Sequence, residues 1–438
     1  MAITLCASVA LIPSALGAKA PTVAEPAATS RKWTNPTIVE RAWIATQLYA
    51  TVGRYFAHWE GLAPGYDWDS RFHAYLSEAL TAPDRRAFTL ATQRLVASLA
   101  NGHTDFGDDA LRDEPPLPFY ARPLEGRWTV TVSRMAGLAP GDVITAIDGM
   151  RVDDWLRPTR AVVGESNARG VDRAAFLRPQ AMPQRFTLTL NTGRKVVVDR
   201  NIAVGEPSPP AKPMEVGVEQ RADGTVIIRI PSFDDPKLEA AAIAAVQSHR
   251  QAPLILFDVR NNGGGNTPAD LLATIMTRPY AGTIVHTPMT IAQFAADGVF
   301  DPDYDPAPSP VLRYGPVVTQ PLPDAVTTPM AILADGGCAS ACEDFAIRFR
   351  SGQRGPILGE TTFGSTGQPY VVTWPKLGFR LRVSTKREFF ADGKPFEGVG
   401  VVPDIPIPLS SADLRAAGDP QLERALAALH AASRQDAK

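Results

Sequence analysis

Two stretches of the sequence combine residue types that can carry nucleophilic chemistry. In the first, an apolar run ends in Gly336-Gly337, and Ser340 stands where the next helix is expected to begin. A hydroxyl at such a turn is exposed, and the helix N-terminus can stabilise negative charge that develops beside it. Serine is also a favoured N-cap residue, so Ser340 could instead do no more than begin a helix.

The second stretch, Phe257–Asn266, contains three consecutive glycines, Gly263–Gly265, between an expected buried strand and an expected helix. Without side chains in the way, backbone N–H groups can approach a substrate oxygen, as an oxyanion hole requires. A phosphate-binding loop is the competing interpretation, but no Gly-Lys-Ser/Thr follows these glycines.

Together the two stretches resemble the C-terminal-processing (tail-specific) serine peptidase family, including its tricorn-like branch. The shared motifs are D-x-R-N-N-x-G-G at Asp258–Gly265, S-A-S-A-x-E at Cys338–Glu343 with Cys338 in place of the first serine, G-E-x-T-F-G at Gly359–Gly364 and G-x-G-V-x-P-D at Gly398–Asp404. The order of these motifs is more specific than any one of them. The resemblance implies a crotonase-like α/β core in which Ser340 attacks a peptide carbonyl.

The position of the general base departs from the better-known members of this family. They carry a lysine shortly after T-F-G, where this chain has Ser365, and neither Lys376 nor Lys386 fits that place in the pattern. The tricorn-like branch uses a histidine at the end of the helical N-terminal domain, which corresponds to His103 in Asn-Gly-His-Thr. Histidine has a suitable pKa for a base near neutral pH. A helix-terminal surface histidine is the plainer interpretation of His103.

The remaining members of the expected site also follow from the resemblance. A glutamate before G-x-G-V-x-P-D, here Glu397, is expected to orient His103, with Glu360 and Asp105 as rivals. The oxyanion donors are expected to be the N–H group of Gly263 or Gly264 together with that of Ala341. No cofactor and no metal is implied.

The elements that must position these residues suggest a multidomain α/β protein. Apolar residues recur at helical spacing between residues 35 and 111, and strands alternate with helices from Val226 onward. Between them, Gly137–Gly149 resembles the G-L-x-P-G-D-x-I-x-x-I-d-G run of PDZ domains, which bind extended peptides at a sheet edge. A small barrel that only separates the flanking domains is the alternative.

The expected boundaries are as follows: 1–20 signal peptide, 21–34 flexible leader, 35–117 helical N-terminal domain, 118–204 PDZ-like domain, 205–410 α/β catalytic core with a long insertion at 279–328, and 411–438 C-terminal helix or tail.

The composition and the N-terminus restrict partners and location. Hydrophobic residues make up 45% of 438 residues, and Lys+Arg 44 nearly balance Asp+Glu 46, which does not favour nucleic acid. An apolar start ending in Ala18-Lys19-Ala20 fits a signal peptide, although no basic residue precedes the apolar stretch. We therefore expect an exported, periplasmic or extracellular protein with no integral membrane span and an unknown oligomeric state.

Two of the three cysteines, Cys338 and Cys342, flank the candidate nucleophile. They could form a disulfide that locks or shuts the site in an oxidising compartment, or they could be small buried packing residues.

The sequence thus predicts a serine endopeptidase that hydrolyses unfolded tails or short peptides through an acyl-enzyme. A non-catalytic binding protein for peptides or apolar ligands is the first alternative, because the fold also resembles retinoid-binding relatives. A PDZ-type interaction scaffold is the second.

Overall fold

The computed structural model describes residues 33–112, 114, 116–201, 214–289 and 311–436. The expected signal peptide, most of the leader, the Pro-rich linker at 207–213 and the middle of the 279–328 insertion lie outside the described residues.

The helical part begins with α1 (Ile38–Tyr55), whose N-cap Thr37 forms a capping box with Glu40. It continues with η1 (Trp59–Gly61), α2 (Trp68–Thr81), α3 (Arg85–Ala97), β1 (Asp105–Asp108) and α4 (Asp109–Arg112). Side chains of Asp67 and Asp84 cap α2 and α3. The predicted helical region is therefore present, and His103 lies in the connection between α3 and β1.

A hairpin from the C-terminal half completes this helical part. Strands β17 (Pro369–Trp374) and β18 (Phe379–Ser384) pair with β1 in the order β1-β18-β17. Trp374, Phe379 and Leu381 are buried in the same cluster as the apolar faces of α1, α2 and α3. Our placement of this hairpin in the α/β core was therefore wrong, because local periodicity identifies strands but not the surface that covers them.

The middle part, within residues 117–200, is β-rich. Strands β2 (Phe119–Leu124) and β3 (Arg127–Ser133) pair, and a second sheet has the order β5-β4-β6-β7, formed by β4 (Ile144–Ile147), β5 (Met150–Arg151), β6 (Arg185–Leu190) and β7 (Lys195–Asp199). Asp148 and Gly149 both have positive φ, which confirms the expected turn between β4 and β5. Short helices connect these strands: α5 (Val152–Trp155), α6 (Arg157–Arg160), α7 (Ala168–Ala175) and η2 (Pro179–Ala181).

The last part is a layered α/β core, as predicted. Its six-stranded sheet has the order β20-β16-β15-β10-β9-β8, formed by β8 (Gly217–Gln220), β9 (Val226–Arg229), β10 (Ile255–Asp258), β15 (Met330–Ala334), β16 (Ile357–Gly359) and β20 (Ile405–Pro406). All neighbours are parallel except β8 and β9. Parallel strands buried on both faces are nearly continuous in apolar residues, as β15 is.

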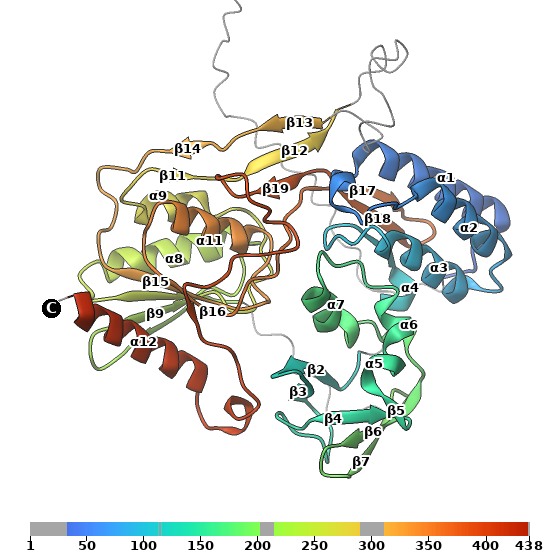
Figure 1. The fold of residues 1–438 in the computed structure, drawn as a ribbon, viewed down its shortest axis with the longest axis horizontal. Coiled ribbons are helices and arrows are strands. Elements are labelled where there is room, and N and C mark those ends of the chain that lie inside the picture. The colour runs from blue at the N-terminus through green and yellow to red at the C-terminus, as the bar shows by residue number, and fades with distance from the viewer. Residues whose placement is uncertain (1–32, 113, 115, 202–213, 290–310, 437–438) are drawn as a thin grey trace, which may run out of the picture. The chain divides into compact units, whose positions relative to one another are not determined.

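Helices cover both faces of this sheet (Figure 1). On one face lie α8 (Pro236–Ser248), α9 (Ala269–Ile275) and α11 (Ala341–Ser351), which bury Phe257 and Phe345. On the other face α12 (Pro420–Asp436) packs Leu422 and Leu426 against alternate strand residues such as Leu256. The carboxyl ends of β10 and β15 lead into the two stretches that the sequence singled out, so both stretches meet at one edge of the sheet.

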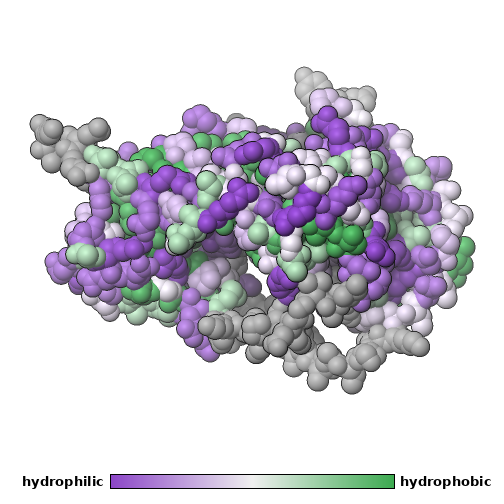
Figure 2. All heavy atoms as spheres, turned by 90° about the horizontal axis from the view of Figure 1, so that it is seen from below, coloured by the Kyte–Doolittle hydropathy of each residue, from purple (hydrophilic) through white to green (hydrophobic). Residues whose placement is uncertain are grey.

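The described ends of the insertion form small sheets beside the core. Strands β12 (Ile284–Pro288), β13 (Val311–Tyr314) and β19 (Arg387–Phe389) form one, and β11 (Tyr280–Ala281) and β14 (Val318–Thr319) form the other. A short η3 (Asp413–Arg415) precedes α12. No described helix is long and apolar enough to cross a membrane. On the face in Figure 2, apolar residues lie in several separate places between hydrophilic ones.

Candidate active site

Ser340 occupies a sharp turn between β15 and α11. Its φ of 56° and ψ of −121° lie outside the regions that a residue with a side chain ordinarily adopts. Such a conformation costs about 1–3 kcal/mol and persists only where the surrounding structure holds it. Ser340 is the N-cap residue of α11, but its backbone angles differ from the extended ones that an N-cap ordinarily has.

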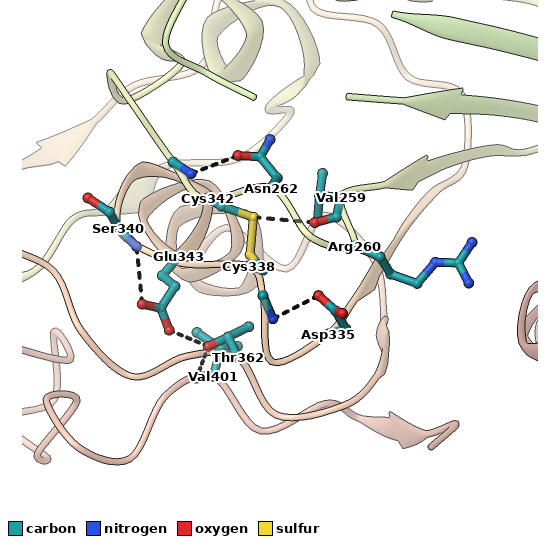
Figure 3. The surroundings of a disulfide bond; sticks show 12 residues. Val259, Arg260, Asn262, Asp335, Cys338, Ser340, Cys342, Glu343, Thr362 and Val401 are labelled. Carbon is teal, nitrogen blue, oxygen red and sulfur yellow. Dashed lines mark hydrogen bonds between the residues drawn. A yellow bond between two sulfur atoms is a disulfide. The ribbon is translucent and has the colours of Figure 1, made fainter. Parts of the chain in front are cut away.

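Glu343 holds the Ser340 turn from inside the protein. Its fully buried carboxylate accepts hydrogen bonds from the N–H groups of Ser340 (3.3 Å), Gly364 (2.7 Å) and Ser365 (3.0 Å), and also from the Thr362 hydroxyl. Figure 3 shows Glu343 below the turn, with the Ser340 hydroxyl pointing away from it. Burial raises the pKa of Glu343 to about 8, against these hydrogen bonds. Glu343 therefore connects the Ser340 turn to the loop that follows β16.

The cysteines on either side of Ser340 form a disulfide, which answers the question that the sequence left open (Figure 3). Cys338 and Cys342 are both fully buried, and their Cα atoms lie 5.3 Å apart. Ser340 is the middle residue of the small ring that this bridge closes.

The glycine loop after β10 packs directly against the Ser340 turn. A Cβ atom added to Gly264 would lie 2.6 Å from the Ala339 carbonyl oxygen and 2.8 Å from the Ser340 Cβ, so only glycine fits there. The Ala339 N–H donates to the Asn262 carbonyl oxygen at 3.1 Å, which joins the loop to the turn.

The expected oxyanion donors differ in whether their N–H groups already have a hydrogen-bond acceptor in the protein. The Gly264 N–H donates to the Asn262 side-chain oxygen at 2.9 Å. Within the described residues, the N–H groups of exposed Gly263 and of Ala341, at the start of α11, donate to no protein acceptor. Among the described residues, Gly263 and not Gly264 therefore has an N–H group without a protein acceptor beside Ser340.

His103 lies beside the same site, where the chain leaves the helical part. Its Nδ1 is 3.0 Å from the Ser365 Oγ, and a Cβ on Gly367 would lie 2.7 Å from the His103 Cβ. Ser365 in turn accepts the Ser340 N–H with its carbonyl oxygen at 3.1 Å. Ser365 thus contacts both His103 and Ser340, although no hydrogen bond between the Ser340 hydroxyl and His103 occurs among the described residues.

The electrostatic surroundings keep His103 neutral. Burial, together with the positive charges of Arg382 and Lys386, lowers the pKa of His103 to about 4. A neutral imidazole is the form that can accept a proton, but this pKa lies below the near-neutral value expected from the sequence because of the burial.

Glu397 reaches His103 through Ser365. The Ser365 hydroxyl donates to Glu397 Oε1 at 2.8 Å, and the hydroxyl of Ser166 and the amide of Asn101 donate to the same oxygen at 3.0 and 3.1 Å. Burial raises the pKa of Glu397 to about 7, whereas the hydrogen bonds from Ser365 and Ser166 act to lower it. Because the Ser365 proton is directed at Glu397, its oxygen can accept a hydrogen bond from His103 Nδ1–H. This tautomer leaves Nε2 unprotonated.

The rival carboxylates are engaged elsewhere. Glu360 forms an ion pair with Arg122 at 3.3 Å and accepts the N–H of Leu409. Asp105 forms an ion pair with Arg382 at 3.2 Å. Among the described residues neither Glu360 nor Asp105 forms a hydrogen bond or an ion pair with His103, whereas Glu397 is one hydroxyl away.

Lys386 also lies near the site but is held by a carboxylate. Its Nζ is 2.9 Å from Glu388 Oε1. Burial alone would lower the pKa of Lys386, but the negative charges of Glu388 and Asp344 and the hydrogen bond with Glu388 raise it above the ordinary value. Lys386 is therefore a charged group and a poor proton acceptor.

Sequence reasoning missed several residues that build the site. Asn101 donates to Glu397 and accepts the His103 N–H at 3.0 Å, and Ser166 accepts the Gly102 N–H at 3.2 Å. Glu343 stands in the recognised motif and could have been singled out by its fixed spacing from Ser340. Ser166 lies in the β-rich part, far from any motif, and nothing in the sequence pointed to it.

Glu165 is a second unexpected carboxylate beside the site. It lines a cavity of about 440 Å³ with Gly102, and its Oε2 has no hydrogen-bond partner in the described structure. Burial, with a further contribution from Asp105, raises the pKa of Glu165 to about 7 against the effect of Arg178.

Residues 224–407 match the model of Peptidase family S41. This chain is 26% identical over 280 residues to the chloroplastic C-terminal processing peptidase of Tetradesmus obliquus, an alignment that covers 62% of this chain. The alignment spans about half of that relative, 53% of its length.

Two solved structures share the fold at low sequence identity. Mature CPAF is 17% identical with a TM-score of 0.65, and the match covers 86% of this chain and 94% of that one. A putative peptidase from Parabacteroides merdae is 14% identical with a TM-score of 0.54, covering 90% and 97%.

Proposed function

Because the chain carries a Peptidase family S41 domain at residues 224–407, we propose that it is a serine peptidase with Ser340 as nucleophile and His103 as general base. One observation carries this proposal: Ser365 contacts Ser340 through its carbonyl oxygen and His103 through its hydroxyl, and the same hydroxyl donates to Glu397. The three expected catalytic residues thus surround one serine, although they lie far apart in the sequence.

In the proposed reaction, the Ser340 Oγ attacks a peptide carbonyl carbon while its proton passes to His103 Nε2. The imidazolium that forms keeps its Nδ1–H directed at Ser365, whose own proton is directed at Glu397. The negative charge of Glu397 stabilises the imidazolium through this hydroxyl. His103 then gives the proton to the leaving amine, and water releases the acyl group from Ser340 by the same steps.

The oxyanion that forms on the carbonyl is proposed to accept hydrogen bonds from Gly263 and Ala341. Neither N–H group donates to an acceptor within the part of the chain that the structure describes, and the α11 N-terminus contributes positive potential at the same place. Gly264 serves instead as the close-packing position that brings the loop against Ser340.

We further propose that the substrate is an unfolded tail or a short peptide and that the β-rich part is a PDZ-like unit that binds it. The Gly137–Gly149 resemblance supports this, as does a cavity of about 430 Å³ lined by strand β2 residues, Arg122 to Leu124, and by loop residues such as Phe363. A crotonase-like core and an exported location remain parts of the same proposal.

Hydrolysis of unfolded protein tests the proposal. Wild type, Ser340→Ala and His103→Ala are incubated with a reduced, alkylated protein, and the fragments are identified by mass spectrometry. We expect fragments with wild type and none with either variant. Equal cleavage by Ser340→Ala would contradict the assignment, and binding of the polypeptide without cleavage by wild type would favour the non-catalytic alternative.

A further inference from the structure

The disulfide between Cys338 and Cys342 surrounds the nucleophile symmetrically. Each cysteine is two residues from Ser340, and the sequence separation of the pair is only 4. A bridge that closes so short a loop removes little freedom from the unfolded chain compared with a bridge over a long one. Its main effect is therefore local, on the conformation of the turn it closes.

The turn needs such local support. Ser340 has a φ of 56° without being a glycine, and chain segments on both sides of it must stay in place for this angle to persist. Phe363 donates its N–H to the Cys338 carbonyl oxygen at 3.0 Å, and Ala339 donates to Asn262. The bridge thus fixes the segment that carries both the Ser340 turn and the contacts with the two loops around it.

The surroundings of the disulfide favour a stable bond over one that is rapidly reduced and re-formed. Both cysteines are fully buried, and the Cys342 Sγ lies 3.8 Å from the Val259 carbonyl oxygen at the end of β10. A thiolate attacking this disulfide must reach a sulfur atom along its bond, and burial excludes such an attack until the turn opens.

We propose that the Cys338–Cys342 disulfide is a positioning element that holds Ser340 in its reactive conformation, so that the chain gains full peptidase activity only after this bridge has formed. The inference rests on the proposed function. Bridge formation requires an oxidant of the disulfide class: two protein thiols and glutathione disulfide give the protein disulfide and two glutathione thiols.

The first test compares folded protein with and without the bridge. Wild type is unfolded and reduced, one portion is refolded under reductant and a second portion with glutathione disulfide present, and the rate of fluorophosphonate labelling of Ser340 is measured in both. We expect labelling and peptide cleavage to rise at least about tenfold on oxidation, because the strained turn is then populated. Peptide binding to the Ser340→Ala variant should change by less than about twofold.

The second test distinguishes the effect of the disulfide on kcat from the effect of packing by the two cysteine side chains. Cys338→Ala, Cys342→Ala and the double variant are compared for kcat, KM and response to glutathione disulfide, with folding checked by circular dichroism. A bridge predicts that each single variant loses as much kcat as the double variant and that glutathione disulfide raises the kcat of none of them. Additive losses would indicate packing alone and overturn the inference.

The outcomes distinguish this inference from the function on which it rests. If reduced wild type and the double variant cleave as fast as oxidised wild type, the disulfide does not position Ser340, although the peptidase assignment stands. If oxidised wild type is not labelled and does not cleave peptide, both the disulfide inference and the peptidase assignment fail.

Discussion

The carboxylate of Glu397 is joined to the imidazole of His103 through a single hydroxyl, that of Ser365. Ser365 stands at the position where the resemblance described above leads one to expect a lysine base, and its hydroxyl supplies the connection that the proposed histidine mechanism needs. The direction of its O–H toward Glu397 selects the His103 tautomer with a free Nε2.

Removing this hydroxyl should separate His103 from Glu397. For Ser365→Ala we expect kcat to fall about 100-fold with little change in KM, because the tautomer and the orientation of the base act in the transition state. Steady-state cleavage of a fluorogenic peptide measures both constants. Ser411→Ala, which removes an exposed hydroxyl bonded to Glu125, is the control and should behave as wild type. An unchanged kcat in Ser365→Ala would show that the Ser365 hydroxyl has no role in catalysis.

The pH dependence of kcat/KM should follow Glu397 and not His103. With its pKa lowered to about 4 by burial and by Arg382 and Lys386, His103 is neutral at every pH above about 6. The pKa of Glu397 is raised to about 7 by burial, so its stabilising charge is absent below that pH and develops above it. We therefore expect kcat/KM to rise between about pH 6 and pH 8.

Glu397→Gln tests the origin of this rise. The variant keeps a side-chain oxygen that can accept the Ser365 hydrogen bond but carries no charge at any pH. We expect a lower kcat/KM and a profile that is flat from about pH 6 upward. A rise near pH 7 that persists in Glu397→Gln would assign it to another group.

If Lys386 and not His103 were the general base, removing Lys386 would abolish the activation of Ser340. Because Lys386 forms an ion pair with the buried Glu388, Lys386→Met alone would leave the Glu388 charge without its cation, so Lys386→Met/Glu388→Gln is the appropriate variant. We expect its rate of fluorophosphonate labelling to stay within about threefold of wild type. A loss of about 100-fold or more, in a folded variant, would indicate a Ser–Lys mechanism.

The buried carboxylate of Glu165 should lower the free energy of unfolding at neutral and alkaline pH. Its pKa is raised from 4.5 to about 7 by burial, so the folded state holds a proton that the unfolded state has lost between these values. The penalty is absent below about pH 4.5, grows through the interval and reaches about 3 kcal/mol above pH 7. Glu165→Gln should therefore be more stable than wild type at pH 8 and equally stable at pH 4.5.

Urea unfolding at the two pH values measures this difference. Glu360→Gln is the matched control, because Glu360 is paired with Arg122 and its replacement should destabilise the protein. Equal stability of Glu165→Gln and wild type at pH 8 would mean that the Glu165 carboxylate has a partner in solution.

The sequence predicted those parts of the molecule that depend on local pattern. The strand that ends before Gly336, the turn at Asp148-Gly149 and the helix that begins after Ser340 follow from periodicity and turn residues. The β17–β18 hairpin was assigned to the wrong part, because its pairing with β1 is a contact between residues nearly 280 positions apart, as Asp105 and Arg382 are.

The candidate site likewise has residues that the sequence predicted and contacts that it could not predict. Motif order pointed to Ser340, His103 and Glu397, but no pattern could show that Ser365 lies between them or that Ser166 donates to Glu397. Such contacts depend on how separate parts of the chain fold together. The disulfide was left open for a related reason, since spacing of four residues permits a bridge without requiring one.

The most direct test of the central claim is fluorophosphonate labelling of wild type, Ser340→Ala and His103→Ala, with peptide mapping of the adduct. An activated serine with a histidine base predicts an adduct on Ser340 in wild type, none in Ser340→Ala, and a rate at least about 100-fold lower in His103→Ala. Undiminished labelling of Ser340 in His103→Ala would contradict the histidine base, and absence of any adduct in wild type would contradict the peptidase assignment itself.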